Sequence, residues 1–277
     1  MAFFGNSEFS SLVLEKMKAL GILPNIIITT PDKPKGRKME LAKTPTKIWA
    51  EDNSIEYLEA ENLKDEGFLE KASLYDIYIV ASYGKIIPKN LLDMPKYGVL
   101  NVHPSLLPKY RGPSPLQEQI LNNEKDVGVS VMLVDERVDH GPVLTQKKVE
   151  MENWPVGFNK LSKILAEEGA EILSEILPDW IKGKIKAKEQ NHNQATFTKK
   201  VEKNDGLTDL SANPFKNYLK YLAYEEWPKT FFEITKNNQK KRVLIKKAEW
   251  KNGELKILRV IPEGKKEMSY DDFQRGL

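Results

Sequence analysis

Short apolar runs alternate with amphipathic stretches through the first two-thirds of the chain, and this alternation restricts the possible folds more than any other feature. Strand-like apolar runs occupy residues 1–5, 25–30, 75–84, 98–103 and 127–136, and apolar residues recur at helical spacing over 7–21 and 157–177. Strands separated by helical segments of this length are typical of parallel sheets, whose neighbouring strands need a crossover connection. The sequence therefore predicts an α/β fold with a Rossmann-like, mostly parallel sheet wrapped by helices.

The composition changes after about residue 185. Residues 186–206 are polar and basic with few apolar side chains, which is typical of a linker or of an extended crossing segment. A short helix-like stretch at 213–224 and several alternating strand-like runs follow, with turn signals at 236–238 and at Asn252-Gly253. We therefore predict a first domain over 1–185, a linker over 186–206 and a small β-rich domain over 207–277.

The positive charge is concentrated in two places. Residues 201–277 contain 16 basic and 12 acidic side chains, although the net charge of the whole chain is +3. A second basic cluster lies between Lys33 and Lys47, in a loop that also contains Pro34, Gly36 and Pro45. Both clusters are compatible with an anionic partner, but a solvated lysine-rich surface has the same composition.

Several classes of protein are excluded by what the sequence lacks. With no cysteine and three histidines, the chain has no disulfide, thiolate zinc site or iron–sulfur cluster, and a metal site is disfavoured. The motifs of dinucleotide-binding enzymes, P-loop NTPases, elbow-type serine hydrolases and zincins are absent. The apolar runs fall short of the ~20 residues of a membrane-spanning helix, and no signal peptide is recognisable. We expect a cytoplasmic protein that uses neither a metal nor a membrane.

The most informative polar residues lie at 98–117, in GVLNVHPSLLPKYRGPSPLQ. Asn101 and His103 are two residues apart at the end of a predicted strand, so their side chains share the face and the edge where α/β sheets bind ligands. Asp139 and His140 lie downstream in a glycine-containing turn. An amide, an imidazole and a carboxylate suit attack by an amine on a carbonyl carbon. Spacing alone equally allows a structural role for these groups.

These residues belong to segments that resemble one enzyme family. NVHPSLLPKYRGPSPLQ (101–117) and DERVDHGPVL (135–144) closely resemble the folate-dependent formyltransferases. FFGNSEFS (3–10), ASYGKIIPKNLLDMPKYG (81–98) and EEWPKTFFEI (225–234) extend the resemblance along nearly the whole chain, to the members that act on methionyl-tRNA. The resemblance implies formyl transfer from 10-formyltetrahydrofolate to the α-amine of initiator methionyl-tRNA.

The resemblance also implies roles for individual residues. Asn101 would donate a hydrogen bond to the formyl oxygen, His103 would assist proton transfer from the amine, and Asp139 would orient and stabilise His103. The implied folate pocket is formed by two segments, namely Ser105, Leu106, Leu107 and Pro108, and the backbone of the 81–87 loop, with Tyr83, Gly84, Ile86 and Ile87. The implied tRNA contacts are the basic residues Lys35, Arg37, Lys38, Lys241 and Arg242.

The C-terminal domain of such enzymes is an OB-like barrel, which we expect to be trimmed here because Lys251, Asn252 and Gly253 alone separate two of its strand-like runs. We expect a monomer. Two alternatives stay open: a formyltransferase for a small amine, such as an amino sugar or glycinamide ribonucleotide, or a non-catalytic folate- or RNA-binding module. The basic clusters favour a polyanionic acceptor over a small amine, and the complete set of Asn101, His103 and Asp139 argues against the module.

Overall fold

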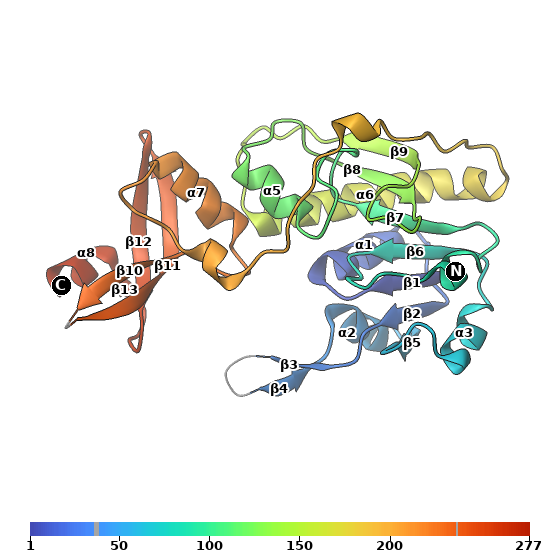
Figure 1. Cartoon of the computed structure of the whole chain (residues 1–277), viewed down its shortest axis with the longest axis horizontal. Helices are drawn as coiled ribbons and strands as arrows, with labels where there is room; N and C mark the ends of the chain where they lie inside the picture. The colour runs from blue at the N-terminus through green and yellow to red at the C-terminus, as the bar shows by residue number, and fades with distance from the viewer. Residues whose placement is uncertain (36–38, 237) are drawn as a thin grey trace. The chain divides into compact units, whose positions relative to one another are not determined.

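The computed structural model describes residues 1–35, 39–236 and 238–277. Its main sheet has seven strands in the order β5-β2-β1-β6-β7-β8-β9 (Figure 1). They are β1 (Ala2–Gly5), β2 (Ile26–Thr29), β5 (Glu56–Glu59), β6 (Tyr78–Ala81), β7 (Val99–His103), β8 (Gly128–Leu133) and β9 (Val143–Lys148). The first five strands in this order are parallel, whereas β8 pairs antiparallel with both of its neighbours, β7 and β9. The predicted, mostly parallel α/β sheet is confirmed.

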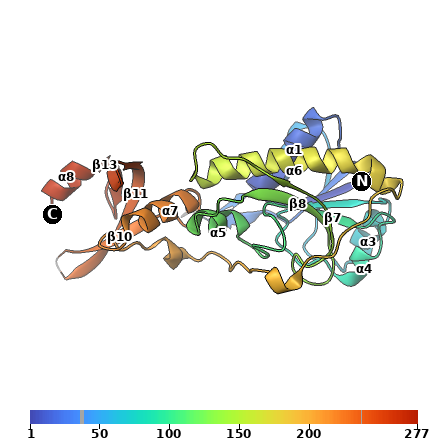
Figure 2. The ribbon, with the colours of Figure 1, turned by 90° about the horizontal axis from the view of Figure 1, so that it is seen from above.

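Helices cover both faces of this sheet (Figure 2). One face carries α1 (Glu8–Ala19) and α6 (Phe158–Ile181), with α2 (Pro45–Asp52) packed beside α1, and the other carries α3 (Glu66–Ala72) and α4 (Lys89–Leu92). Every residue of β1, β2 and β6 is buried. Burial on both faces explains why these strands are continuous apolar runs in the sequence. Among the described residues, none of the helices has the length and apolar character to cross a membrane.

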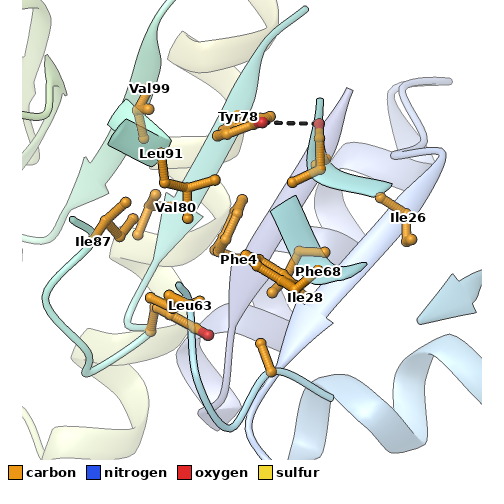
Figure 3. Close-up of a cluster of buried hydrophobic side chains, with 14 residues drawn as sticks. Phe4, Ile26, Ile28, Leu63, Phe68, Tyr78, Val80, Ile87, Leu91 and Val99 are labelled. Carbon is orange, nitrogen blue, oxygen red and sulfur yellow. Dashed lines mark hydrogen bonds between the residues drawn. The ribbon is translucent and has the colours of Figure 1, made fainter. Parts of the chain in front are cut away.

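The core on the α3 and α4 face is drawn in Figure 3. The ring of Phe4 lies 5.3 Å from that of Tyr78 and 5.4 Å from that of Tyr83, measured between centroids. The hydroxyl of Tyr78 donates to the carbonyl of Ala72, at the end of α3, over 2.8 Å. Burial raises the pKa of Tyr78 to about 12. The phenol therefore stays protonated at neutral pH and keeps this hydrogen bond between sheet and helix.

On the opposite face, α6 approaches the sheet closely at Gly169. A Cβ atom at this position would lie 2.5 Å from Val102 Cγ1 and 3.0 Å from Val129 Cγ2. Glycine therefore allows the helix backbone to pack directly against β7 and β8. This contact supports β7, the strand that carries Asn101 and His103, on the α6 face of the sheet.

A small antiparallel hairpin, β3 (Lys33–Lys35) and β4 (Glu40–Ala42), lies outside the main sheet. Next to its base, the ammonium group of Lys47 lies 2.9 Å from a carboxylate oxygen of Asp32 and 2.5 Å from one of Glu59. The hydrogen bonds to Glu59 and Asp32 raise the pKa of Lys47. The sequence analysis counted Lys47 in the basic cluster between Lys33 and Lys47. In the structure its charge is instead paired with two carboxylates.

The chain divides into two compact units. The first unit comprises residues 1–113, 126–150 and 162–197, and the second comprises residues 114–125, 151–161 and 198–277. Two segments of the predicted 1–185 domain thus cluster with the C-terminal part of the chain. The boundaries at 185 and 206 stay predictions.

The second unit combines helices with an antiparallel sheet in the order β10-β11-β12-β13. Its elements are α5 (Pro115–Leu121), α7 (Pro214–Ala223), β10 (Phe231–Lys236), β11 (Gln239–Lys251), β12 (Glu254–Pro262), β13 (Met268–Ser269) and α8 (Tyr270–Arg275). Asn252 and Gly253, with φ of 54° and 79°, join β11 to β12 in the left-handed conformation typical of a two-residue hairpin turn. The described strands form an open sheet, as expected for a trimmed barrel.

Candidate active site

The carboxyl end of β7 presents the two polar residues that the sequence singled out. Asn101 lies opposite Met132 of β8, and His103 lies opposite Ser130. Because they occupy alternate positions of one strand, their side chains share a face of the sheet. His103 is buried and Asn101 is partly buried.

Asp139 reaches the same place from the turn between β8 and β9. Its Oδ1 atom lies 3.4 Å from Asn101 Nδ2 and 3.7 Å from His103 Nδ1, and its Oδ2 atom accepts a hydrogen bond of 2.7 Å from the N–H of Gly112. Asp139 has a φ of 48°, a left-handed conformation that aspartate tolerates better than most residues. The structure thus brings the three predicted catalytic side chains together around one carboxylate.

The contacts of His103 indicate which ring nitrogen is available for proton transfer. Nε2 lies 3.0 Å from the carbonyl oxygen of Tyr110. A carbonyl accepts but cannot donate a hydrogen bond, so we assign the ring hydrogen to Nε2. In the neutral ring the lone pair is then on Nδ1, which faces Asp139 Oδ1. Nδ1 can accept a proton, and the carboxylate of Asp139 then stabilises the charged ring.

Hydrogen bonds fix the loop over residues 104–113, which follows β7. Ser105 Oγ donates to the carbonyl of Lys109 over 2.7 Å, and the N–H of Leu107 donates to Ser130 Oγ over 3.1 Å. Ser130 Oγ donates to the carbonyl of Ser105 over 2.6 Å, and Gln146 Nε2 donates to that of Leu107 over 2.8 Å. The loop is therefore fixed by β8 and β9 as well as by its prolines.

An open pocket of about 510 Å³ lies against this loop. Its lining residues are Leu106, Pro108, Lys109, Asp126 and Gln194. Two of the predicted folate contacts, Leu106 and Pro108, thus face open space, whereas Ser105 and Leu107 are buried. An apolar wall beside an open volume suits a planar ring.

The second predicted folate segment follows β6. The side chain of Ile87 is buried in the core cluster (Figure 3), as is that of Tyr83, whereas Gly84 is exposed and Ile86 is 82% exposed. Asn6 Nδ2 donates to the carbonyl of Tyr83 and fixes the start of this loop. Burial raises the pKa of the Tyr83 phenol. The loop therefore offers its backbone and Ile86 to a ligand, rather than the buried side chains of Tyr83 and Ile87.

The predicted tRNA contacts are only partly described. Arg37 and Lys38 lie outside the described residues, and of Lys35 the structure describes the backbone, at the end of β3. Lys241 and Arg242 are consecutive on β11, so their side chains leave opposite faces of the sheet. The guanidinium carbon of Arg242 lies 3.2 Å from the centre of the Phe231 ring, and burial lowers the pKa of Arg242. These two residues are therefore not brought together on one surface.

A buried polar network beside Asp139 was missed by the sequence analysis. Arg111 is 2% exposed and donates to Gln190 Oε1 and to His192 Nδ1. Gln190 Nε2 in turn donates to the carbonyl of Asp139. Burial lowers the pKa of Arg111, and the nearby charges of Asp139 and Asp135 oppose that shift. The segment that contains Gln190 was predicted to be a linker, because no periodicity there marks an inward-facing residue.

The chemistry that the site can perform follows from three groups. Asn101 provides a hydrogen-bond donor for a carbonyl oxygen, His103 provides a proton acceptor, and Asp139 provides a carboxylate for the protonated imidazole. Within the residues that the structure describes, no group of three or more potential ligands is arranged to hold a metal ion.

Comparison with known proteins identifies relatives of the whole chain. A model of the formyl transferase family matches residues 1–177. The methionyl-tRNA formyltransferase of Herpetosiphon aurantiacus is 32% identical, over 99% of this chain and 96% of the relative. The solved methionyl-tRNA formyltransferase from Clostridium thermocellum has a TM-score of 0.57 at 20% identity, over 88% of this chain and 99% of its own. An N-formyltransferase from Helicobacter canadensis, in complex with folinic acid and dTDP-3-aminofucose, has a TM-score of 0.63 at 17% identity, over 97% of both chains.

Proposed function

The chain belongs to the formyl transferase family, and from this premise we propose that it transfers the formyl group of 10-formyltetrahydrofolate to the α-amine of initiator methionyl-tRNA. The observation that carries the proposal is the position of Asp139 Oδ1, 3.4 Å from Asn101 Nδ2 and 3.7 Å from His103 Nδ1. One carboxylate oxygen thereby orients both a hydrogen-bond donor and a base, as transfer to an amine requires.

Asn101 acts on the carbonyl oxygen. Its Nδ2 group is oriented toward Asp139 before any substrate arrives. When an amine attacks the formyl carbon, negative charge builds on the formyl oxygen, and a hydrogen bond from Nδ2 strengthens with that charge. A donor fixed in advance stabilises the transition state more than the ground state, which raises kcat rather than substrate affinity.

His103 acts on the proton. The attacking amine must lose a proton as its nitrogen bonds to the formyl carbon, and His103 Nδ1 accepts it. The buried ring then carries a positive charge, which Asp139 Oδ1 stabilises from 3.7 Å. When the bond from the formyl carbon to the leaving nitrogen breaks, His103 returns a proton to that nitrogen, and the ring is neutral again.

Two segments of the first unit offer exposed groups for binding folate. When bound, 10-formyltetrahydrofolate supplies a formyl carbonyl on a nitrogen that can leave. Leu106 and Pro108 form an apolar wall of the 510 Å³ pocket, and Gly84 and Ile86 are exposed on the loop after β6. We propose that these residues contact the ring system of the donor, with Ser105 and Leu107 fixing the loop from inside.

Methionyl-tRNA is the acceptor that the relatives and the charge distribution favour. The H. aurantiacus relative is a methionyl-tRNA formyltransferase, and β11 carries basic side chains over Lys240–Arg242 and at Lys246 and Lys247. A long polyanion can contact several such groups at once. We propose that the enzyme acts in the cytoplasm, where charged tRNA and reduced folate meet, and that it acts as a monomer.

The test measures formyl transfer by the full-length protein from 10-formyltetrahydrofolate to charged initiator tRNA. Parallel reactions contain an amino-sugar nucleotide or glycinamide ribonucleotide, and the matched control is a His103→Asn variant. We expect transfer to methionyl-tRNA by the wild type and almost none by the variant. Transfer to a small amine but not to methionyl-tRNA would replace the proposed acceptor. Folate binding without transfer to any amine would indicate a binding module.

A further inference from the structure

The segment between α6 and residue 198 is attached to the catalytic edge at two places. Lys188 exchanges two backbone hydrogen bonds of 2.8 Å with Val143 at the start of β9. Eight residues later, the carbonyl of Thr196 accepts from the N–H of Arg111 over 2.9 Å. Between these attachments Gln190 is 8% exposed, although its neighbours on both sides are exposed. The attachments thus direct one polar side chain inward.

The amide of Gln190 uses all of its hydrogen-bonding capacity. Nε2 donates to the carbonyls of Asp139 over 3.0 Å and Gly141 over 2.7 Å. Oε1 accepts from Arg111, over 3.2 Å from Nε and 2.7 Å from Nη2. Two carbonyls can only accept and a guanidinium can only donate, so the partners fix which end of the amide faces which. Among side chains of this length, only that of glutamine combines two hydrogen-bond donors with an acceptor in this arrangement.

These bonds act on the backbone that carries the carboxylate of Asp139. A φ of 48° at Asp139 persists only where the surroundings fix it. On one side the N–H of Gly112 contacts Asp139 Oδ2 at 2.7 Å, and on the other Gln190 contacts the Asp139 carbonyl. At Gly141 a Cβ atom would lie 2.1 Å from the carbonyl oxygen of Leu133, so the backbone of the turn packs directly against the end of β8 and only glycine fits there.

We propose that Gln190 is a positioning residue for the transfer reaction, whose amide fixes the peptide of Asp139 and thereby the carboxylate between Asn101 and His103. The inference rests on the proposed function, in which Asp139 stabilises the protonated His103. The hydrogen bonds of the Gln190 side chain go to the Arg111 guanidinium and to the backbone carbonyls of Asp139 and Gly141. Gln190 therefore acts through Asp139.

Arg111 makes a diagnostic substitution possible. In Gln190→Glu the carboxylate pairs with the buried guanidinium at least as strongly as the amide does. The same carboxylate has no N–H for the carbonyls of Asp139 and Gly141. Gln190→Met removes both sets of bonds with a similar side-chain length. The matched control is Asn193→Asp, the same change from amide to carboxylate at an exposed position of the same segment.

Kinetics on the full-length variants give the first readout. We expect kcat for methionyl-tRNA to fall about tenfold to a hundredfold in Gln190→Glu and Gln190→Met, the scale of a catalytic group misplaced by about 1 Å. The KM for the folate donor should change by less than about threefold, because the amide does not contact the pocket. Asn193→Asp should behave as the wild type. Unchanged kcat in both Gln190 variants overturns the proposal.

A double-substitution cycle then separates positioning from a general structural role. If Gln190 acts through Asp139, Gln190→Met should lower kcat strongly in the wild-type background and hardly at all in an Asp139→Asn background. A residue that merely supports the fold would lower kcat by the same factor in both backgrounds. Equal factors would therefore overturn the proposal even if both single variants lose activity.

Hydrogen exchange provides a readout that needs no activity. The N–H of Gly112 donates to Asp139 Oδ2, so a peptide covering residues 108–114 should exchange faster in both Gln190 variants and not in Asn193→Asp. Peptides from β11 should be unchanged in all three. If the wild type does not formylate methionyl-tRNA but this pattern appears, the proposed function fails and the positioning of Asp139 stands. If the wild type is active and the exchange is unchanged, the positioning fails.

Discussion

The two units of the chain place their polar side chains in opposite ways. In the first unit they converge, because the other two predicted catalytic side chains and Gln190 all approach Asp139. In the second unit the basic residues are spread along β11, and consecutive ones such as Lys241 and Arg242 leave opposite faces. A reaction needs several groups at one point, whereas a polyanion is bound through many separate contacts. Single substitutions among the converging residues of the first unit should therefore lower turnover strongly, whereas single substitutions of basic residues in the second unit should have small effects.

The largest effect is expected for Asn101→Ala. The variant lacks the amide that donates a hydrogen bond to the formyl oxygen as negative charge builds there. This loss should lower kcat about a hundredfold or more. The KM for the folate donor should change little, since the amide matters chiefly in the transition state. Asn101→Asp should be equally impaired because an ionised carboxylate has no hydrogen to donate. A near-normal kcat in Asn101→Ala would remove Asn101 from the catalytic group.

Asp139→Asn should have the next largest effect, lowering kcat by about tenfold to a hundredfold. Asparagine also tolerates the left-handed backbone at this position, so the fold is preserved and the change is one of charge. A neutral amide stabilises a protonated His103 less than a carboxylate does. Steady-state kinetics with both substrates, together with circular dichroism, test this. If the variant had the kcat and the circular dichroism spectrum of the wild type, Asp139 would be a structural residue. The first unit would then not differ from the second in its response to single substitutions.

In the second unit we expect a smaller effect, which concerns tRNA binding and its salt dependence rather than kcat. Replacing Lys241, Lys246 and Lys247 together by glutamine should weaken tRNA binding several-fold at physiological salt. The slope of log K against log salt should fall by roughly 0.7–0.9 for each lost phosphate contact. Lys163→Gln, an exposed lysine of the first unit, is the control. Equal slopes for the triple variant and the wild type would show that β11 does not meet the nucleic acid.

The smallest effect is expected for Tyr78→Phe, which removes the hydroxyl that donates to Ala72. Loss of this buried hydrogen bond should cost about 1 kcal/mol of unfolding free energy, measured by urea denaturation, and leave kcat unchanged. The pKa of Tyr78 is raised to about 12, so its folded state favours the protonated phenol. The contribution of the Tyr78 phenol to the unfolding free energy should be constant below about pH 10, the ordinary tyrosine pKa. It should be lost as the pH rises toward 12. A change in kcat would show that the core and the site are not independent.

The sequence predicted the sheet and the strand that carries Asn101 and His103 because both depend on local patterns. Apolar runs such as 26–29 and 78–81 are buried on both faces, and the two-residue spacing of Asn101 and His103 places them together in any extended strand. Asp139 was noted in a glycine-containing turn, but its role beside Asn101 and His103 came from the family resemblance, since 38 residues separate it from Asn101 and no local pattern connects them.

The features that the sequence analysis missed depend on contacts that are distant in sequence. Gln190 is inward-facing because Arg111, 79 residues away, provides a buried charge for it to contact. The backbone of the loop around Gly84 was predicted to line a pocket, but the sequence did not indicate that the side chains of Tyr83 and Ile87 complete the core with Phe4 and Leu91. The composition of residues 186–206 and of residues 83–87 shows which residue types are present. It does not show which of their side chains point into the protein.

The attachment of Thr196 has a consequence for how the protein is made. The N–H of Tyr110 donates to Thr196 Oγ1, a residue 86 positions later, and synthesis at about 5–20 residues per second takes roughly 4–17 s to cover that distance. During this interval a nascent chain can already contain β1 to β9 and still lack Gln190 and Thr196. A translation product that stops before Lys188 would carry Asn101, His103 and Asp139 without the hydrogen bond from Gln190 to the Asp139 carbonyl. The ability to transfer a formyl group should therefore arise late in synthesis, well after the sheet that supports it.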